Sequence, residues 1–175
     1  MPLPVAHGLL GASVGAALQP LESRYWRTLW ISAFLAICPD FDYALNWLRI
    51  SGGGWHHGFT HSFLFAACLG LFTALILREV KIRSIIIFCS AAASHTLIDY
   101  VMTESHGVAL WWPFTHHRHK LSFPNPIDYT WDDSTVSRMV IDLLRISLTE
   151  LVIFGAIFVA VLWIKKATRK RATVS

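Results

Sequence analysis

Charged side chains are scarce in this sequence. They make up 15 % of its 175 residues, whereas hydrophobic residues make up 54 %. Soluble domains carry roughly 25 % charged residues, so the composition indicates a single membrane domain rather than a soluble one. Apolar runs of about 18 residues or more indicate membrane spans, and two are evident, at 59–77 and 146–164. Two shorter runs, at 26–38 and 82–98, extend into segments that carry Asp and His.

Cysteine is also rare, and the spacing of its three copies excludes two kinds of site. Cys38, Cys68 and Cys89 all lie in apolar segments, and no two form a C-x-x-C pair. The sequence therefore indicates neither a thiolate zinc site nor a disulfide framework. The N-terminus, Met1–His7, lacks the basic stretch and small-residue cleavage site of a signal peptide, so we expect none to be removed.

The hydrophobic pattern predicts an all-α fold, a polytopic membrane bundle of about four to five helices. The predicted helices cover about 5–20, 27–48, 59–78, 83–103 and 141–164, and a long loop covers 104–140. We expect residues 1–164 to form one membrane-embedded, metal-dependent hydrolase-like domain. Residues 165–175 would form a basic cytoplasmic tail.

Basic residues orient this bundle. With the C-terminus in the cytoplasm, ten Lys and Arg side chains fall on the cytoplasmic side and five on the other. Cytoplasmic loops carry the excess of basic residues, so we expect the long loop outside, in a multi-pass protein of the bacterial inner membrane. The basic residues lie at span ends, and no nucleic-acid partner is indicated.

With this orientation, histidines and aspartates from four predicted helices lie at the outer membrane face. They are His7, Asp40, Asp42, His57, His61, His95 and Asp99. Ionisable groups at membrane depth are costly and usually mark function. The i,i+4 spacing of His57 with His61, and of His95 with Asp99, predicts that each pair shares one helical face. Pro39 allows local unwinding, so that either Asp40 or Asp42 ligates while the other orients or bridges.

Imidazole nitrogen with carboxylate oxygen suits zinc, manganese or iron(II) better than calcium. We therefore predict a divalent metal site, with zinc the first choice. The competing interpretation is a set of unrelated interface histidines.

Three further features each allow more than one interpretation. Gly52–Gly54 is a turn or a backbone approach to a ligand. The segment His116–His119 with Lys120 either binds a phosphate, adds a metal ligand or faces lipid headgroups. Glu150 is a ligand, a partner of Arg145 or protonated.

A series of short motifs resembles a known family. In order they are His7-Gly8, Pro39-Asp40-Phe41-Asp42, His57-Gly58-Phe59-Thr60-His61-Ser62, Ser94-His95-Thr96-Leu97-Ile98-Asp99 and Trp112-Pro113-Phe114. This series, over roughly residues 5–115, resembles the YdjM-like family of bacterial inner-membrane proteins, regarded as metal-dependent hydrolases. That family is in turn similar to zinc-dependent phospholipase C and its nuclease relatives. Those soluble helical enzymes hold zinc with His and Asp and cleave phosphodiesters.

The sequence departs from the family pattern at two points. The family has Arg where this chain has His56, so that either His56 or His57 matches the family histidine. A second His-x-x-x-acid pair is also not evident, and Glu150, His106 or His116–His119 would have to stand in for it. A site for one or two metal ions is therefore expected rather than one for three.

The resemblance and the ligand types together predict a membrane-bound metal-dependent hydrolase acting on a phosphate ester or a lipid-linked phosphodiester. The bilayer and such a substrate are the expected partners. Asp42, His57 and Asp99 are the expected catalytic residues, because an unligated Asp or His would serve as general base. The alternative is a non-enzymatic membrane protein, a metal or proton carrier or a stress-response factor, in which the metal is structural.

Overall fold

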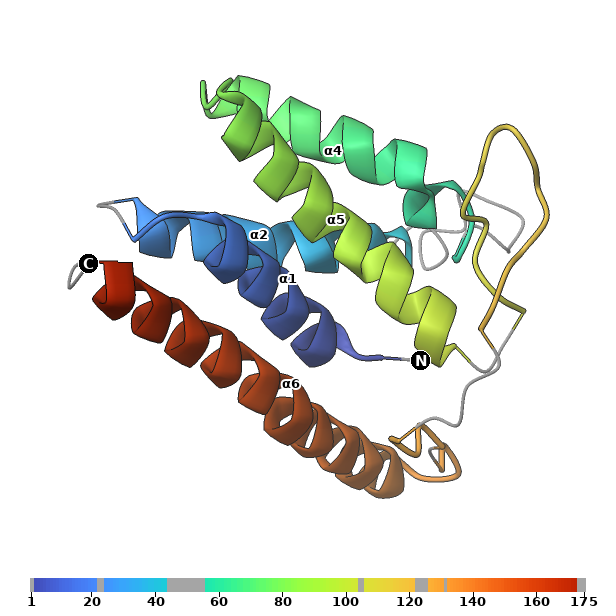
Figure 1. The fold of residues 1–175 in the computed structure, drawn as a ribbon. Coiled ribbons are helices and arrows are strands. Elements are labelled where there is room, and N and C mark those ends of the chain that lie inside the picture. Colours follow the sequence, from blue (N-terminus) through green and yellow to red (C-terminus); the bar gives the residue numbers. More distant parts are fainter. Residues whose placement is uncertain are drawn as a thin grey trace.

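The computed structural model describes residues 2–21, 24–43, 56–103, 106–121, 126–130 and 132–172. Figure 1 shows these residues folded as a helical bundle, and they contain no strand, only an isolated bridge between Val108 and His119. The predicted all-α fold is confirmed. The helices are α1 (Pro4–Leu18), α2 (Tyr25–Ile37), α4 (Phe63–Ile76), α5 (Ile82–Met102) and α6 (Val136–Ala172), with the short 3₁₀ helices η1 (Cys38–Phe41) and η2 (Phe59–His61).

Two predicted helices begin or end differently because of local chain chemistry. The helix predicted at 27–48 ends as α2 at Ile37, and the 3₁₀ turn η1, with Pro39 in its first turn, follows. Residues 44–48 of that prediction lie outside the described residues. The helix predicted at 59–78 begins only at Phe63, because Ser62 caps it by accepting a hydrogen bond from the amide of Phe65.

The last helix is longer than predicted at both ends. It begins at Val136 rather than 141 and runs to Ala172. Residues 165–172, expected as a tail separate from the helix, therefore continue α6. Lys and Arg are good helix formers, so the basic composition of this segment does not end the helix.

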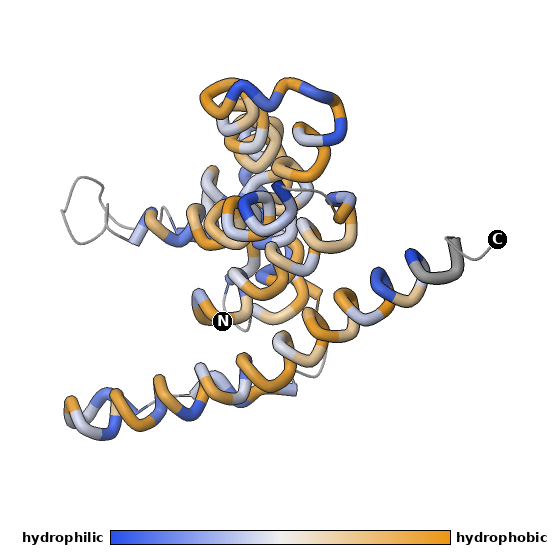
Figure 2. Tube along the Cα trace, turned by 90° about the vertical axis from the view of Figure 1, so that its left-hand side faces the viewer, coloured by the Kyte–Doolittle hydropathy of each residue, from blue (hydrophilic) through white to orange (hydrophobic). Residues whose placement is uncertain are grey.

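Within the described residues, two helices are long and apolar enough to cross a membrane: the 21-residue α5 and residues Val136–Arg169 of α6. The helices α1 and α4 are apolar but have only 15 and 14 residues. The span predicted at 59–77 is thus a short helix preceded by a 3₁₀ turn. The shorter apolar run at 82–98, by contrast, lies within the full-length helix α5. Figure 2 shows the hydrophobic residues along these helices.

Small residues let the helices pack closely. A side chain at Gly15 of α1 would place its Cβ 2.6 Å from Ser32 Oγ of α2, and one at Gly70 of α4 would lie 2.5 Å from the Cys89 amide nitrogen of α5. Close approach at small residues is how helices associate in membranes, where lipid competes for apolar contacts. The helices of the pair α1 and α2 run antiparallel, as do those of the pair α4 and α5, whereas α6 runs parallel to α1 (Figure 1).

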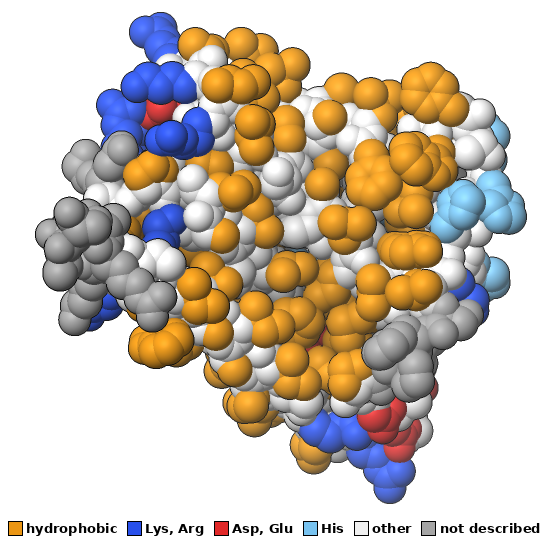
Figure 3. Space-filling view, viewed as in Figure 1, with side chains coloured by type: hydrophobic (Ala, Val, Ile, Leu, Met, Phe, Trp, Pro, Cys, Tyr) orange, Lys and Arg blue, Asp and Glu red, His pale blue; other side chains and the backbone are white. Residues whose placement is uncertain are grey.

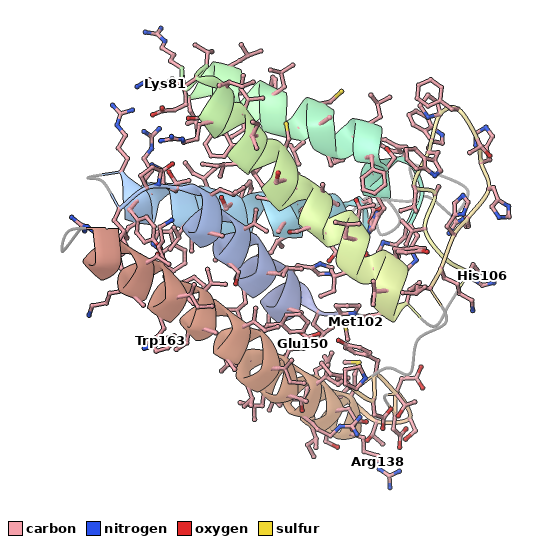
Figure 4. The ribbon with its side chains drawn as sticks, viewed as in Figure 1. Lys81, Met102, His106, Arg138, Glu150 and Trp163 are labelled. Atoms are coloured by element: carbon pink, nitrogen blue, oxygen red, sulfur yellow. The ribbon has the colours of Figure 1, made fainter. Side chains whose placement is uncertain are left out.

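The opposite ends of the bundle differ in chemistry. Lys and Arg gather at one end, whereas the other end carries the His side chains together with further charged residues of both signs, and apolar side chains lie between the two ends (Figure 3). At the basic end Arg24, just before α2, and Arg27, within it, both pair with Glu79. Lys81 marks that end and His106 the other in Figure 4. The site described next lies at the His106 end, where α1 begins and α5 finishes.

Candidate metal centre

Four buried side chains from three elements meet at this end of the bundle. His7 lies in the first turns of α1, Asp40 in η1, and His95 and Asp99 near the end of α5. One ligand atom from each lies within 4.8 Å of all the others. His7, His95 and Asp99 are fully buried and Asp40 nearly so. The helix termini therefore gather the first candidate ligand set, here called group A (His7, Asp40, His95 and Asp99).

A second set, group B, consists of His56, His57 and His61, whose ligand atoms also lie within 4.8 Å of one another. Asp99 connects the two groups, because its Oδ2 is 3.3 Å from His61 Nε2 and 3.9 Å from His57 Nε2. His61 in turn lies 3.5 Å from Asp40 Oδ1. The two groups thus form one continuous cluster.

The distances within group A suit ligands around an ion better than hydrogen bonds. His95 Nε2 lies 3.2 Å from Asp99 Oδ2, and His7 Nε2 lies 3.6 Å from Asp99 Oδ1 and 3.7 Å from Asp40 Oδ2. Hydrogen bonds of this kind centre on roughly 2.9 Å. Two ligands about 2.05 Å from a tetrahedral zinc lie about 3.3 Å apart. The cluster is therefore spaced like a coordination shell.

Several atoms of these side chains are buried and have no hydrogen-bond partner among the described residues. They are Nδ1 and Nε2 of His7, Asp40 Oδ1, Nε2 of His57, His61 and His95, and both carboxylate oxygens of Asp99. A buried polar atom left unpaired costs about 1–3 kcal/mol, and a concentration of them calls for an explanation such as an ion. Nitrogen and carboxylate oxygen are suitable donors for a divalent metal, so the residues present fit one.

Hydrogen bonds behind the cluster fix which histidine nitrogen faces it. His95 donates from Nδ1 to the carbonyl oxygen of Ala36, 2.7 Å away, which leaves its Nε2 lone pair towards the carboxylates. Thr60 donates to Asp42 Oδ2 at 2.6 Å and lies 2.9 Å from His61 Nδ1. The Thr60 oxygen can then accept from His61 Nδ1–H, which directs His61 Nε2 inwards. Partners of this kind commonly orient metal-binding histidines.

Asp42 belongs to this outer layer and to neither ligand group. Its Oδ1 lies 2.9 Å from His56 Nδ1, and its Oδ2 holds Thr60. Burial alone would raise its pKa, but the hydrogen bonds from His56 and Thr60 outweigh burial and lower it. Of the two aspartates that flank Phe41, Asp40 faces the ligands and Asp42 orients them. The local cause is the 3₁₀ turn after Pro39, which points the two carboxylates differently.

The electrostatics of group B favour neutral His57 and a positive charge at His61. Burial lowers the pKa of His57 to about 3. Burial also opposes charge on His61, but the facing carboxylates of Asp40 and Asp99, 3.5 and 3.3 Å from its Nε2, outweigh that effect and raise its pKa to about 9. The carboxylates thus stabilise positive charge at this point. A divalent ion supplies such charge to deprotonated ligands.

His57 and His61 approach each other by a route that differs from the predicted one. They do not share a helical face, because His57 precedes η2 and has a φ of 60°, in the left-handed region that side chains rarely adopt. Neighbours hold this turn: the His57 carbonyl accepts from the amide of Ala109, and Arg118 donates to the His56 carbonyl at 3.4 Å. Strained backbone of this kind costs about 1–3 kcal/mol and often occurs at functional sites.

The structure leaves the other candidates outside both ligand groups. Glu150 is fully buried, yet its carboxylate accepts from the backbone amides of Leu3 and Ala6 at 2.6 and 3.0 Å. His106, His116 and His117 are exposed in the long loop. Gly52–Gly54 lies outside the described residues. The sequence did not reveal that Thr60 and the Ala36 carbonyl orient the histidines. For Thr60, its position next to His61 was the available signal.

The fold and the site define a helical membrane protein with a buried His/Asp cluster at one end of its bundle. The chain belongs to the YdjM inner membrane protein family, whose model matches residues 1–171. It is 30 % identical over 124 residues to the inner membrane protein YbcI of Escherichia coli (strain K12), covering 67 % of this chain and 71 % of that protein. No solved structure matches the chain. The resemblance drawn from the motifs is confirmed.

Proposed function

We propose that this chain is a membrane-bound metal-dependent hydrolase of phosphate esters. The observation that carries the proposal is the convergence of unpaired, buried imidazole and carboxylate atoms from α1, η1, η2 and α5. A purely structural cluster would pair these atoms with one another at hydrogen-bond distance. Their wider spacing leaves them directed at a common centre.

Group A would hold one ion, and group B with Asp99 would complete the site or hold a second. A bound divalent ion lowers the pKa of a coordinated water and polarises a phosphoryl oxygen. The chain contributes the orientation of its imidazoles through Ala36, Thr60 and Asp42. Burial keeps bulk water from competing with the ligands.

Three residues were expected to act in proton transfer, and the geometry supports different roles for them. Asp42 engages both carboxylate oxygens with His56 and Thr60, so it supports a positioning role. His57 and Asp99 face the cluster with buried atoms for which the described part of the chain offers no hydrogen-bond partner. Asp99, which touches both groups, is the better placed of the two to bind the ion.

The carrier alternative has less support. A carrier needs binding points along a path through the membrane. Both ligand groups found among the described residues lie at one end of the bundle, whereas the other end presents the ion pairs of Arg24 and Arg27 with Glu79. Zinc is the first candidate by ligand type, and manganese or iron(II) would also accept these donors.

The test is phosphoesterase turnover by purified, metal-reconstituted protein. Substrates should include soluble phosphomonoesters, phosphodiesters and lipid-linked phosphates. His95→Ala and Asp99→Ala should each lower turnover by about 10²-fold or more, since loss of even an outer partner costs 10–100-fold. The exposed His116→Ala is the matched control. Wild-type protein that is metal-loaded and monodisperse but inert would instead support a structural metal.

A further inference from the structure

A cavity of about 310 Å³ lies beside group A, between the N-terminal segment, the end of α2, η1 and α6. Small-molecule sites generally occupy about 300–1,000 Å³, so this one is large enough for a small ligand group. Leu3, Ile37, Phe41 and Ile146 supply much of its wall, and its other lining residues except Asp40 are prolines and tyrosines.

Among the described residues that line the cavity, Asp40 is the one that carries a charge, and it belongs to group A. Its Oδ1 lies 3.5 Å from His61 Nε2 and 3.6 Å from His95 Nε2. The cavity therefore has an apolar body whose wall is shared, at one point, with the candidate metal centre. A ligand that fits both parts has an apolar portion and a group that binds a cation.

The surface next to the cavity is apolar too. Phe41, in its wall, is 55 % exposed, and its ring contacts that of Phe34, which is equally exposed, with centroids 6.0 Å apart. Trp30 and Trp26 continue this exposed row along α2 at four-residue intervals. Contiguous exposed apolar surface marks a site of contact with lipid or with another apolar surface. The cavity is thus bordered by surface that suits contact with hydrocarbon chains.

We infer that this cavity binds the hydrocarbon chain of an amphiphilic phosphate ester whose phosphate lies at the His/Asp cluster. The inference rests on the proposed hydrolase function and names its substrate class. In the reaction, water adds its oxygen to phosphorus, the P–O bond to the leaving alcohol breaks, and that alcohol takes up a proton. The apolar wall of the cavity selects the hydrocarbon part of the substrate, and the metal centre that includes Asp40 selects its phosphate.

Binding tests the cavity without requiring turnover. Metal-loaded protein in amphipol is titrated with non-hydrolysable alkyl phosphonates of increasing chain length, all below their micelle concentrations. Each methylene that enters an apolar cavity contributes ~0.8 kcal/mol, so affinity should rise about fourfold per methylene and then level off when the cavity is full. Affinity that does not depend on chain length would overturn the inference.

Variants of one lining residue locate the effect. Ile37→Trp should make affinity level off at a shorter chain, and Ile37→Ala at a longer one, because they reduce and enlarge the cavity. Ile86→Trp is the matched control: Ile86 is half exposed on α5 and does not line the cavity. A length profile unchanged in both monodisperse Ile37 variants would overturn the inference.

Turnover of the matching alkyl phosphate esters separates the two proposals. Chain-length dependence in kcat/KM that shifts with Ile37→Trp supports both. Length-dependent phosphonate binding with no ester hydrolysis contradicts the hydrolase but supports the cavity assignment. Hydrolysis of short esters that shows no preference for longer chains supports the hydrolase and contradicts the cavity assignment.

Discussion

Glu150 and Lys165 lie about four turns apart on α6 and bind opposite ends of α1. Glu150 accepts from the amides of Leu3 and Ala6, while the ammonium of Lys165 donates to the carbonyl oxygens of Ala16, Ala17 and Gln19. Negative charge at a helix N-terminus and positive charge at its C-terminus both stabilise the helix. The long α6 therefore fixes α1, and with it His7, along the bundle (Figure 4 marks Glu150).

Removing this N-terminal anchor should disturb the metal centre from a distance. Glu150→Ala leaves two amides unpaired at about 1–3 kcal/mol each. We expect a lower unfolding temperature in detergent and weaker metal binding, because His7 follows directly after Ala6. Glu150→Gln, which keeps an acceptor oxygen, should lose less of both. The exposed Leu148→Ala is the control, and equal metal affinity in Glu150→Ala and Leu148→Ala would contradict this role.

Asp42 should affect metal affinity without being a ligand. Asp42→Asn keeps the size of the side chain but weakens its hold on His56 and Thr60. Loss of such a partner usually costs about 10–100-fold in affinity, while the number of ions bound at saturation should not change. Metal titration with a competing chelator measures both quantities, with the exposed Asp133→Asn as control. A reduced number of bound ions would show that Asp42 is itself a ligand.

The fold was predictable from the apolar runs of the sequence. The order of the helices alone was enough to predict that four side chains meet: His7, Asp40, His95 and Asp99. Each residue lies near a helix end, and antiparallel threading places those ends together. The roles of Asp42 and Glu150 were not predictable. They depend on a 3₁₀ turn and on contact between α1 and α6, which are remote in sequence. The conformation of His57 is likewise set by neighbours such as Ala109 rather than by local pattern.

The membrane orientation remains a prediction from the ten-to-five division of basic residues. A reporter fused after Ser175 should behave as cytoplasmic, and one inserted at the exposed His116 should behave as periplasmic. The two fusions serve as controls for each other. Periplasmic phosphatase activity from the C-terminal fusion would reverse the orientation and place the His/Asp cluster on the cytoplasmic side.

The central claim is that the His/Asp cluster holds a divalent metal, and the metal content of purified protein tests it most directly. Wild-type protein, purified without chelator and analysed by mass spectrometry, should carry close to one or two divalent ions per chain. His61→Ala and Asp99→Ala, which remove contacts to both ligand groups, should lose most of that metal, and His117→Ala should keep it. Folded wild-type protein that neither carries nor takes up zinc, manganese or iron(II) would contradict the claim.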